Sequence, residues 1–210
     1  MKVTFKVLLL AAVLVLAYMC YASVRVQIRF IEERKARESA ISARLIDIRK
    51  AQIEYKNIHK EHAANFDVLA SFLNEEKIPF LIKEGVLTDE QLDLGMTEQE
   101  AVKKGIIRRD TFWMIAKDTL FGKDFNVADL RYVPGTTTQF SMDTATISSS
   151  SGYVVKVFEA GVKYDDYLGD LDRQLLFNLK EVAGKQNKYA GLRVGSLTEI
   201  NNNAGNWEDL

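Results

Sequence analysis

The 210-residue chain has one cysteine and two prolines, and its charges nearly balance. Because Cys20 is the only cysteine, the chain can form no intrachain disulfide and no site with several cysteine ligands for a metal. Cys20 also lies inside an apolar run. With so few prolines, no stretch rich in proline and glycine divides the body. The formal net charge is −1 and no basic stripe occurs, so we expect no nucleic-acid partner.

Histidine is equally scarce, since His59 and His62 are the only two. A Ser-His-Asp or Cys-His arrangement would need a histidine elsewhere in the chain. The spacing of the pair, with Glu61 between them, lacks the five-residue zinc-protease pattern and names no third ligand, so we predict a polar helix end without a metal. No glycine-rich phosphate loop follows a strand. The sequence therefore predicts a non-enzymatic protein without a cofactor.

Four aspartates crowd one stretch of the chain, namely Asp165, Asp166, Asp170 and Asp172. Their spacing misses the calcium-loop pattern, and Asp170 is better explained as a helix cap. Nothing in the sequence singles out a pair of carboxylates for sugar hydrolysis, although any two acids can meet in a fold. An envelope hydrolase that uses carboxylates is therefore the second alternative function.

A long apolar run is the clearest positive feature of the chain. Residues 7–24 carry no formal charge, and as a helix they would span about 27 Å against a hydrocarbon core of about 30 Å. Lys6 and Arg25 bracket the run and can reach the interfaces. The predicted domain 1–24 is therefore a transmembrane anchor with a short basic N-terminus. Its expected lipid-facing residues are Val7, Leu10, Leu14, Tyr18 and Tyr21.

A cleaved signal peptide is the alternative for this run, because Lys2 and Lys6 form a basic start and residues 20–22 resemble a small-x-small site. The length of the run and the absence of a turn signal after it favour a retained anchor. The basic residues that follow the run favour a cytoplasmic body, whereas the basic start is typical of a signal-anchor. We expect a single-pass inner-membrane protein with a periplasmic body.

Residues 25–60 are predicted to form a helical stalk. Its first part, RFIEERKARESA, is charged nearly all round and is predicted to be a solvated spacer. Farther on, a narrow seam has alternating spacings of four and three residues, through Ile41, Leu45, Ile48, Gln52 and Tyr55. The seam is typical of a coiled coil or of a helix docked on the body, and docking is favoured for residues 41–59. Ile48 and Tyr55 are candidate partner-binding residues.

Residues 61–200 are predicted to form one soluble α+β domain. Asn65 can cap a short helix with an apolar face, and Pro79 is expected to end that region. Two sequences, at Thr88 and at Thr97, fit the capping box, and Gly105 is placed to stop the second of these helices.

Strand patterns follow these helices. The segment from Ile106 reads as a strand buried on part of both faces, with Trp113 in the core. QFSMDTATI and YVVKVFEAGV then form the strongest predicted hairpin. Asp170 can cap a helix that Gly184 ends, with its apolar face at Leu171, Leu175, Leu179 and Val182. GLRVGSL is predicted to add a last strand.

This order of elements predicts an antiparallel sheet of three to four strands covered by helices, with a ferredoxin-like variant as one arrangement. The polar tail over residues 201–210 is expected to be irregular. Trp207 lies in that tail with nothing obvious to bury it, which makes it a candidate partner-binding residue.

Two resemblances add to these expectations. The stretch IRKAQIEYKNIHKEHAANFDVLASFL resembles the region after the membrane helix of type IV pilin-like proteins, although the pilin processing site is absent. GIIRRDTFWMIAKDTLFGKDFNVADLRYVP and GLRVGSLTEINNNAGNWE resemble single-pass envelope proteins of Bacteroidetes, which implies export and a tether. The layout is also similar to inner-membrane assembly proteins of pilus and type II secretion systems.

The predicted function is a membrane-tethered, non-enzymatic envelope scaffold or assembly protein. Its expected partners are the bilayer and either an envelope protein or a second copy of the chain. The first alternative is a pilin-like subunit of a secretion or pilus system.

Overall fold

A computed structural model describes residues 2–89, 91, 95–148 and 152–208. Contacts group the chain into two compact units. Unit 1 comprises residues 1–65 and 129–210, and unit 2 comprises residues 66–128. The predicted body over residues 61–200 therefore takes in parts of both units. The predicted α+β class is confirmed.

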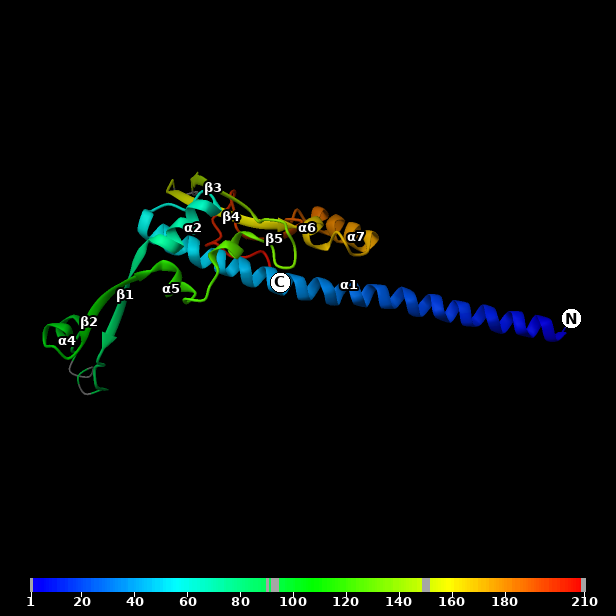
Figure 1. The fold of residues 1–210 in the computed structure, drawn as a ribbon, viewed down its shortest axis with the longest axis horizontal. Helices are drawn as coiled ribbons and strands as arrows, with labels where there is room; N and C mark the ends of the chain where they lie inside the picture. The colour runs from blue at the N-terminus through cyan, green and yellow to red at the C-terminus, as the bar shows by residue number, and fades with distance from the viewer. Residues whose placement is uncertain (1, 90, 92–94, 149–151, 209–210) are drawn as a thin grey trace. The chain divides into compact units, whose positions relative to one another are not determined.

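One continuous helix, α1 (Lys2–His59), begins unit 1 and runs from the apolar segment to the end of the predicted stalk (Figure 1). Its sequence contains no glycine or proline that would interrupt it. The helix ends because Lys60 adopts a left-handed φ of +62°, while the Lys60 N–H donates to the Lys56 carbonyl at 2.9 Å. The apolar segment and the predicted stalk are thus one continuous helix rather than two helices joined by a loop.

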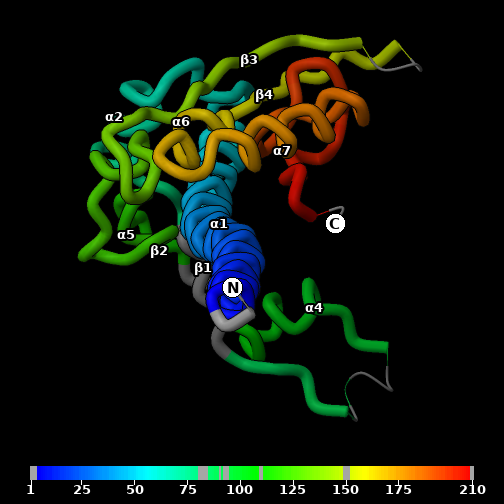
Figure 2. The backbone as a smooth tube through the Cα atoms, turned by 90° about the vertical axis from the view of Figure 1, so that its right-hand side faces the viewer, coloured from blue at the N-terminus to red at the C-terminus, as the bar shows by residue number. Residues whose placement is uncertain are grey.

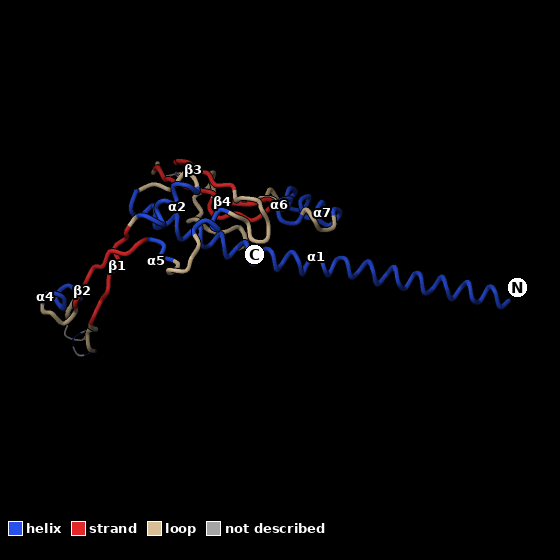
Figure 3. Tube along the Cα trace, in the orientation of Figure 1, coloured by secondary structure: helices blue, strands red, loops and turns tan. Residues whose placement is uncertain are grey.

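Unit 1 contains a three-stranded antiparallel sheet in the order β3-β4-β5. Figure 3 labels β3 and β4 of this sheet, with strands in red. Its strands are β3 (Ser141–Ser148), β4 (Val154–Lys163) and β5 (Gly191–Gly195). The predicted hairpin is confirmed as β3 and β4, with Ser141 opposite Gly161 and Ser148 opposite Val154. The predicted last strand is confirmed as β5.

The C-terminal half of α1 packs on β4 and β5. Ile41, Leu45 and Ile48 are fully buried there, together with the side chain of Gln52. Gln52 makes a matched pair of hydrogen bonds, because its Nε2 donates to the Ala63 carbonyl and its Oε1 accepts from the Ala63 N–H, both at 2.9 Å. The predicted docking of residues 41–59 on the body is confirmed.

Two helices follow β4, namely α6 (Tyr164–Leu168) and α7 (Arg173–Lys185). The predicted cap at Asp170 is wrong, since Asp172 accepts from the Gln174 and Leu175 N–H groups at the start of α7. Asp170 is instead held by an arginine of α1, described below.

The apolar face predicted for α7 is only partly confirmed, because Leu171, Leu175 and Leu179 are half-buried. Leu176 and Ala183 are buried, whereas Val182 is exposed. The helix also passes through Gly184 and ends at Lys185, with Asn187 in the left-handed region at φ +51°. Asparagine tolerates that conformation because its short polar side chain bonds locally.

The predicted solvated spacer is also wrong in part. Phe30 is buried, and Arg34, Arg37 and Glu38 contact α6 or the turn after it. Arg37 and Glu38 of this charged segment therefore have hydrogen-bond partners from a distant part of the sequence. Viewed along α1, β3, β4, α6 and α7 lie on one side of the helix (Figure 2).

The described residues of unit 2 include three short helices and a two-stranded ribbon. The helices are α2 (Phe66–Glu75), α4 (Glu98–Lys103) and α5 (Ala116–Leu120). The apolar face of α2 is confirmed, with Leu69, Phe72 and Leu73 buried. A short 3-10 helix, η1 (Val127–Arg131), lies at the boundary with unit 1.

The capping predictions in unit 2 have different outcomes. The capping box at Thr97 is confirmed, and Gly105 takes a φ of +74° after α4. At the other predicted box, the Gln91 side chain accepts from the Thr88 N–H at 3.1 Å, and residues 90 and 92–94 lie outside the described residues.

The ribbon pairs β1 (Lys77–Glu84) with β2 (Arg108–Ile115) in antiparallel register. The strand predicted from Ile106 is confirmed as β2. Pro79 does not end the region, because it lies inside β1 opposite Trp113. A two-stranded ribbon tolerates this proline, since each strand has one edge on which no N–H donor is required. The five strands described thus form two small sheets, and the ferredoxin-like variant is not confirmed.

Matched isoleucines on α1 test the docking of the helix on the sheet. Replacing buried Ile48 by alanine should lower the free energy of unfolding by about 2–4 kcal/mol, because it leaves a cavity against the sheet. Ile53→Ala, at an exposed position of the same helix, should cost less than about 1 kcal/mol. Denaturant unfolding of the full chain in detergent measures both, and equal losses would contradict the described docking.

Candidate interaction surfaces

The N-terminal part of α1 is an uncovered apolar surface. Among the described residues, a single helix is long and apolar enough to cross a membrane, and the body buries none of its apolar stretch. All five side chains predicted to face lipid are exposed: Val7, Leu10, Leu14, Tyr18 and Tyr21. Such an exposed apolar helix is consistent with a transmembrane or signal-anchor helix.

Directly after this stretch, a polar network joins α1 to α6. Arg34 donates to the Glu38 carboxylate at 2.8 Å, and the Tyr167 hydroxyl donates to the same oxygen at 3.1 Å. The Arg34 guanidinium also lies over the Tyr164 ring, 5.7 Å from its centre. Burial raises the pKa of Tyr167, so its hydroxyl keeps the proton that it donates.

One turn farther along α1, Arg37 holds the turn between α6 and α7. Its two terminal nitrogens donate to the two carboxylate oxygens of Asp170 at 2.5 and 2.8 Å, and one of them also donates to the Tyr167 carbonyl at 2.6 Å. The hydrogen bonds with Arg37 lower the pKa of Asp170. Because a fork-to-fork pair fixes direction as well as distance, it sets the orientation of this turn on the helix.

Each of the four clustered aspartates has a different hydrogen-bond or ion-pair partner. Asp165 pairs with Lys180 at 2.7 Å, and the Asp166 carboxylate accepts from the Lys163 N–H at 3.2 Å. Asp170 pairs with Arg37, and Asp172 caps α7. Within the described part of the chain, no group of three acidic, histidine or cysteine side chains is placed to hold a metal ion.

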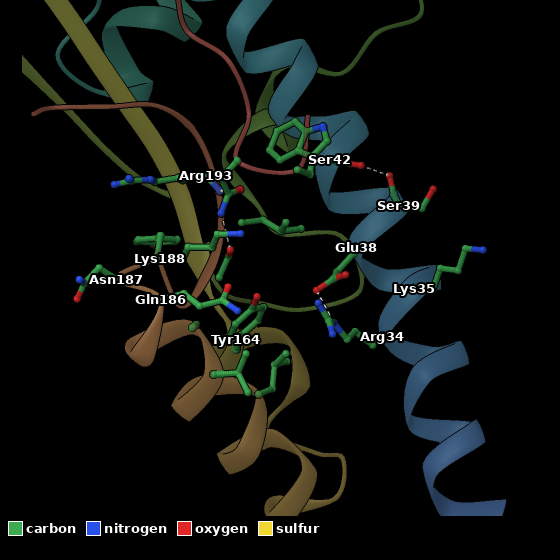
Figure 4. A pocket seen from close by; sticks show the side chains of 18 of the residues that line it. Arg34, Lys35, Glu38, Ser39, Ser42, Tyr164, Gln186, Asn187, Lys188 and Arg193 are labelled. Carbon is green, nitrogen blue, oxygen red and sulfur yellow. Dashed lines mark hydrogen bonds and ion pairs between the residues drawn. The ribbon is translucent and has the colours of Figure 1, made fainter. Parts of the chain in front are cut away.

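A groove of about 660 Å³ opens in unit 1 between α1, the end of α7, β5 and the C-terminal tail (Figure 4). Its walls carry charges of both signs, with Arg34, Lys35, Lys188 and Arg193 against Glu38 and Glu199. In Figure 4, Glu38 on α1 and Lys188 on the opposite wall both extend into the opening. Tyr164, Tyr189 and Trp207 supply aromatic surface.

The C-terminal tail forms one wall of this groove because it is tied to β5. The Asn206 side chain accepts from the Arg193 N–H at 3.0 Å and donates to the Gly191 carbonyl at 2.9 Å. Gly205 bridges to Val194, and a Cβ at Gly205 would lie 2.4 Å from the Trp207 ring. The tail is irregular as predicted, but Trp207 is half-buried in the groove wall instead of being free.

Exposed aromatic surface lies elsewhere, on the ribbon of unit 2. Trp113 is 63% exposed and the neighbouring Phe112 is 51% exposed, so both faces of β2 carry open apolar side chains. The prediction that Trp113 belongs to the core is therefore wrong, as is the expectation that this strand is covered on parts of both faces. Helices α2 and α5 pack only against part of the ribbon, so they leave these rings in solvent.

The two predicted partner residues of the stalk differ in position. Ile48 is fully buried in unit 1, so the proposal that it binds a partner is wrong. Tyr55 is partly buried and stacks on His59 with ring centres 4.3 Å apart, and its partner role stays a prediction.

The two histidines are in different surroundings, which corrects the prediction of a shared polar helix end. His62 is buried against Phe158, with ring centres 4.8 Å apart, and neither ring nitrogen has a hydrogen-bond partner among the described residues. Burial lowers the pKa of His62 to about 4, and the charge of Lys56 acts in the same direction. The buried ring is therefore neutral near pH 7.

Comparison of the chain with family models, with curated proteins and with solved structures found no match. Function is therefore argued from the surfaces just described.

Acid should destabilise the fold through His62. The unfolded ring has a pKa of 6.5 and the folded ring about 4, so between these values the unfolded chain binds more protons and stability falls with falling pH. Between pH 7.5 and pH 5.0 the wild type should lose about 2 kcal/mol more than His62→Phe, which does not titrate. Urea unfolding at both pH values measures the difference, and identical losses would show that His62 is not held neutral.

Proposed function

We propose that the chain is a membrane-tethered, non-enzymatic scaffold of the cell envelope that presents its body to a partner protein. The single observation that carries this proposal is the continuity of α1. The same helix provides the uncovered apolar stretch and, farther on, the buried Ile41, Leu45 and Ile48 of unit 1. One helix consequently supplies both the proposed anchor and part of the core of the body.

The polar network supports a fixed position for unit 1 on the stalk. Arg34 and Arg37 bind α6 and its following turn at residues only 10 to 13 positions beyond Val24, the last residue of the charge-free run. A helix rises about 1.5 Å per residue, so these contacts lie about 15–20 Å beyond that residue. A scaffold that holds its partner at a set distance from the bilayer needs this kind of stiff connection.

The open aromatic rings of the ribbon are the surface on which the partner is proposed to bind. Tryptophan and other aromatic residues dominate the energetics of protein interfaces, and a two-stranded ribbon is marginal without something packed against it. Phe112 and Trp113 lie on opposite faces of β2, so a partner that clasps the ribbon would cover both.

A pilin-like subunit is the second candidate function. Its support is the division of α1 into an uncovered apolar half and a half that packs on an antiparallel sheet. Such a helix suits a subunit that leaves the membrane and buries its apolar half between copies. The intact mass of the mature chain distinguishes the two candidates. Processing of a pilin N-terminus gives a mass below that calculated from the full sequence, whereas an anchored scaffold keeps the full mass.

Membrane retention tests the tether. The full chain should remain in the membrane pellet after alkaline carbonate washing and be released by detergent. Two arginines, Leu10→Arg with Leu14→Arg, should move a large fraction into the soluble supernatant, because each charge costs about 2.5–3.5 kcal/mol at the helix centre. Ala36→Arg, on the exposed part of α1, should remain membrane-bound. Release of the wild type by carbonate would contradict the proposal.

Partner binding tests the ribbon. After chemical cross-linking in intact membranes, Trp113→Ser should recover at least about tenfold less of the wild-type partner, since truncating an interface tryptophan costs 2 kcal/mol or more. Val154→Ser removes an equally open apolar side chain from β4 of unit 1 and should recover the wild-type amount. Equal recovery from both variants would exclude the ribbon as the partner surface.

A further inference from the structure

An exposed apolar stripe continues along α1 beyond the charge-free run. Val24, Ile28 and Ile31 are 58%, 51% and 62% exposed, and they recur at spacings of four and three residues. That spacing places them on one face of the helix. Phe30, Arg34 and Arg37, which contact the body, lie on a different face, so unit 1 leaves the stripe uncovered.

Lipid does not account for the outer end of this stripe. Ile31 is seven residues beyond Val24, which is about 10 Å along the helix, whereas the interfacial layer adds about 5–7 Å to each side of the hydrocarbon core. Charged residues also surround the stripe at this level, namely Arg25, Arg29, Glu32 and Glu33. Ile31 is therefore a large apolar side chain in a polar, aqueous layer, and Ile28, about 6 Å beyond Val24, lies at the outer edge of the interfacial layer.

The stripe continues inward with the same repeat. Counting back from Val24 in steps of three and four reaches Tyr21, Ala17, Leu14, Leu10 and Val7, all of them apolar. A hydrophobic repeat of seven residues keeps one seam of a helix facing another helix over several turns. Beyond Ile31 the repeat stops, because the next positions are Lys35 and Glu38, and Glu38 already binds Arg34 and Tyr167.

We propose that this seam pairs α1 with the α1 of a second copy of the chain, in parallel, from Val7 to Ile31. The inference rests on the proposed tether, because two copies inserted in one membrane in the same direction have their seams at the same depth. A different protein would not in general have an apolar seam at the same depth, whereas a second copy of the chain does.

The residues that flank the seam are compatible with this pairing. In a parallel pair, each flanking residue meets the one five positions later on the other helix. Gln27 then meets Glu32 of the second copy. This pair does not set like charges against each other. β3, β4, α6 and α7 lie on one side of α1 (Figure 2), and Val24, Ile28 and Ile31 are exposed, so these elements of unit 1 leave the seam open to a second helix.

The single native cysteine makes the test direct. In a Cys20→Ser background, one cysteine is placed on the seam, as Ile28→Cys or Ile31→Cys, or off the seam, as Arg29→Cys or Ala36→Cys. All four positions are exposed in the structure. Mild oxidation of native membranes should convert the seam variants to disulfide-linked dimers at least about fivefold more efficiently than the off-seam variants.

The outcomes separate this inference from the tether. Equal or absent cross-linking at all four positions, with the chain still in the membrane pellet, would overturn the paired seam and leave the tether intact. A chain released by carbonate would overturn the tether itself. As an independent readout, Ile28→Glu with Ile31→Glu should reduce dimers formed by an amine-reactive cross-linker, and unchanged dimers would count against the seam.

Discussion

The packing of the C-terminal half of α1 against β4 and β5 is the contact on which the rest of unit 1 depends. Three fully buried aliphatic side chains make the helix part of the hydrophobic core of unit 1, namely Ile41, Leu45 and Ile48. Burial of each such side chain contributes roughly 1.5–3 kcal/mol. The paired hydrogen bonds between Gln52 and Ala63 then fix the chain just after the helix ends.

This arrangement links the apolar N-terminal segment to the body without a hinge. A helix that contributes to the core cannot rotate or slide without disrupting that core, so any orientation imposed on the segment also orients the sheet. Arg34 and Arg37 extend the linkage toward the apolar N-terminal segment by binding α6 and its following turn. Individually such partly exposed pairs contribute little, but a bidentate pair and a shared carboxylate restrict geometry more strongly than their energies suggest.

The two tryptophans show that sequence position alone does not predict which aromatic side chain is buried. The two tryptophans have the opposite exposure from the one that their sequence positions suggest. Trp207 follows a polar run, yet the amide of Asn206 pins the tail to β5 and brings the ring against Gly205. Trp113 lies in a strand of strong apolar pattern, yet that strand has only one neighbour and little cover. Periodicity reports what a strand can bury, whereas exposure depends on what packs against it.

The sequence by itself determined the local elements of this protein. The uninterrupted helix, the β3–β4 hairpin, the last strand and the capping box at Thr97 follow from periodicity, turn residues and short-range hydrogen bonds, all of which act between near neighbours. Only the tertiary structure decided burial and partnership. His62 is neutral because Phe158 covers it, and Asp170 binds Arg37 at a separation of 133 residues while Asp172 caps the helix. The burial of His62 and the partner of Asp170 depend on which residues distant in sequence come into contact, and residue spacing along the chain does not predict those contacts.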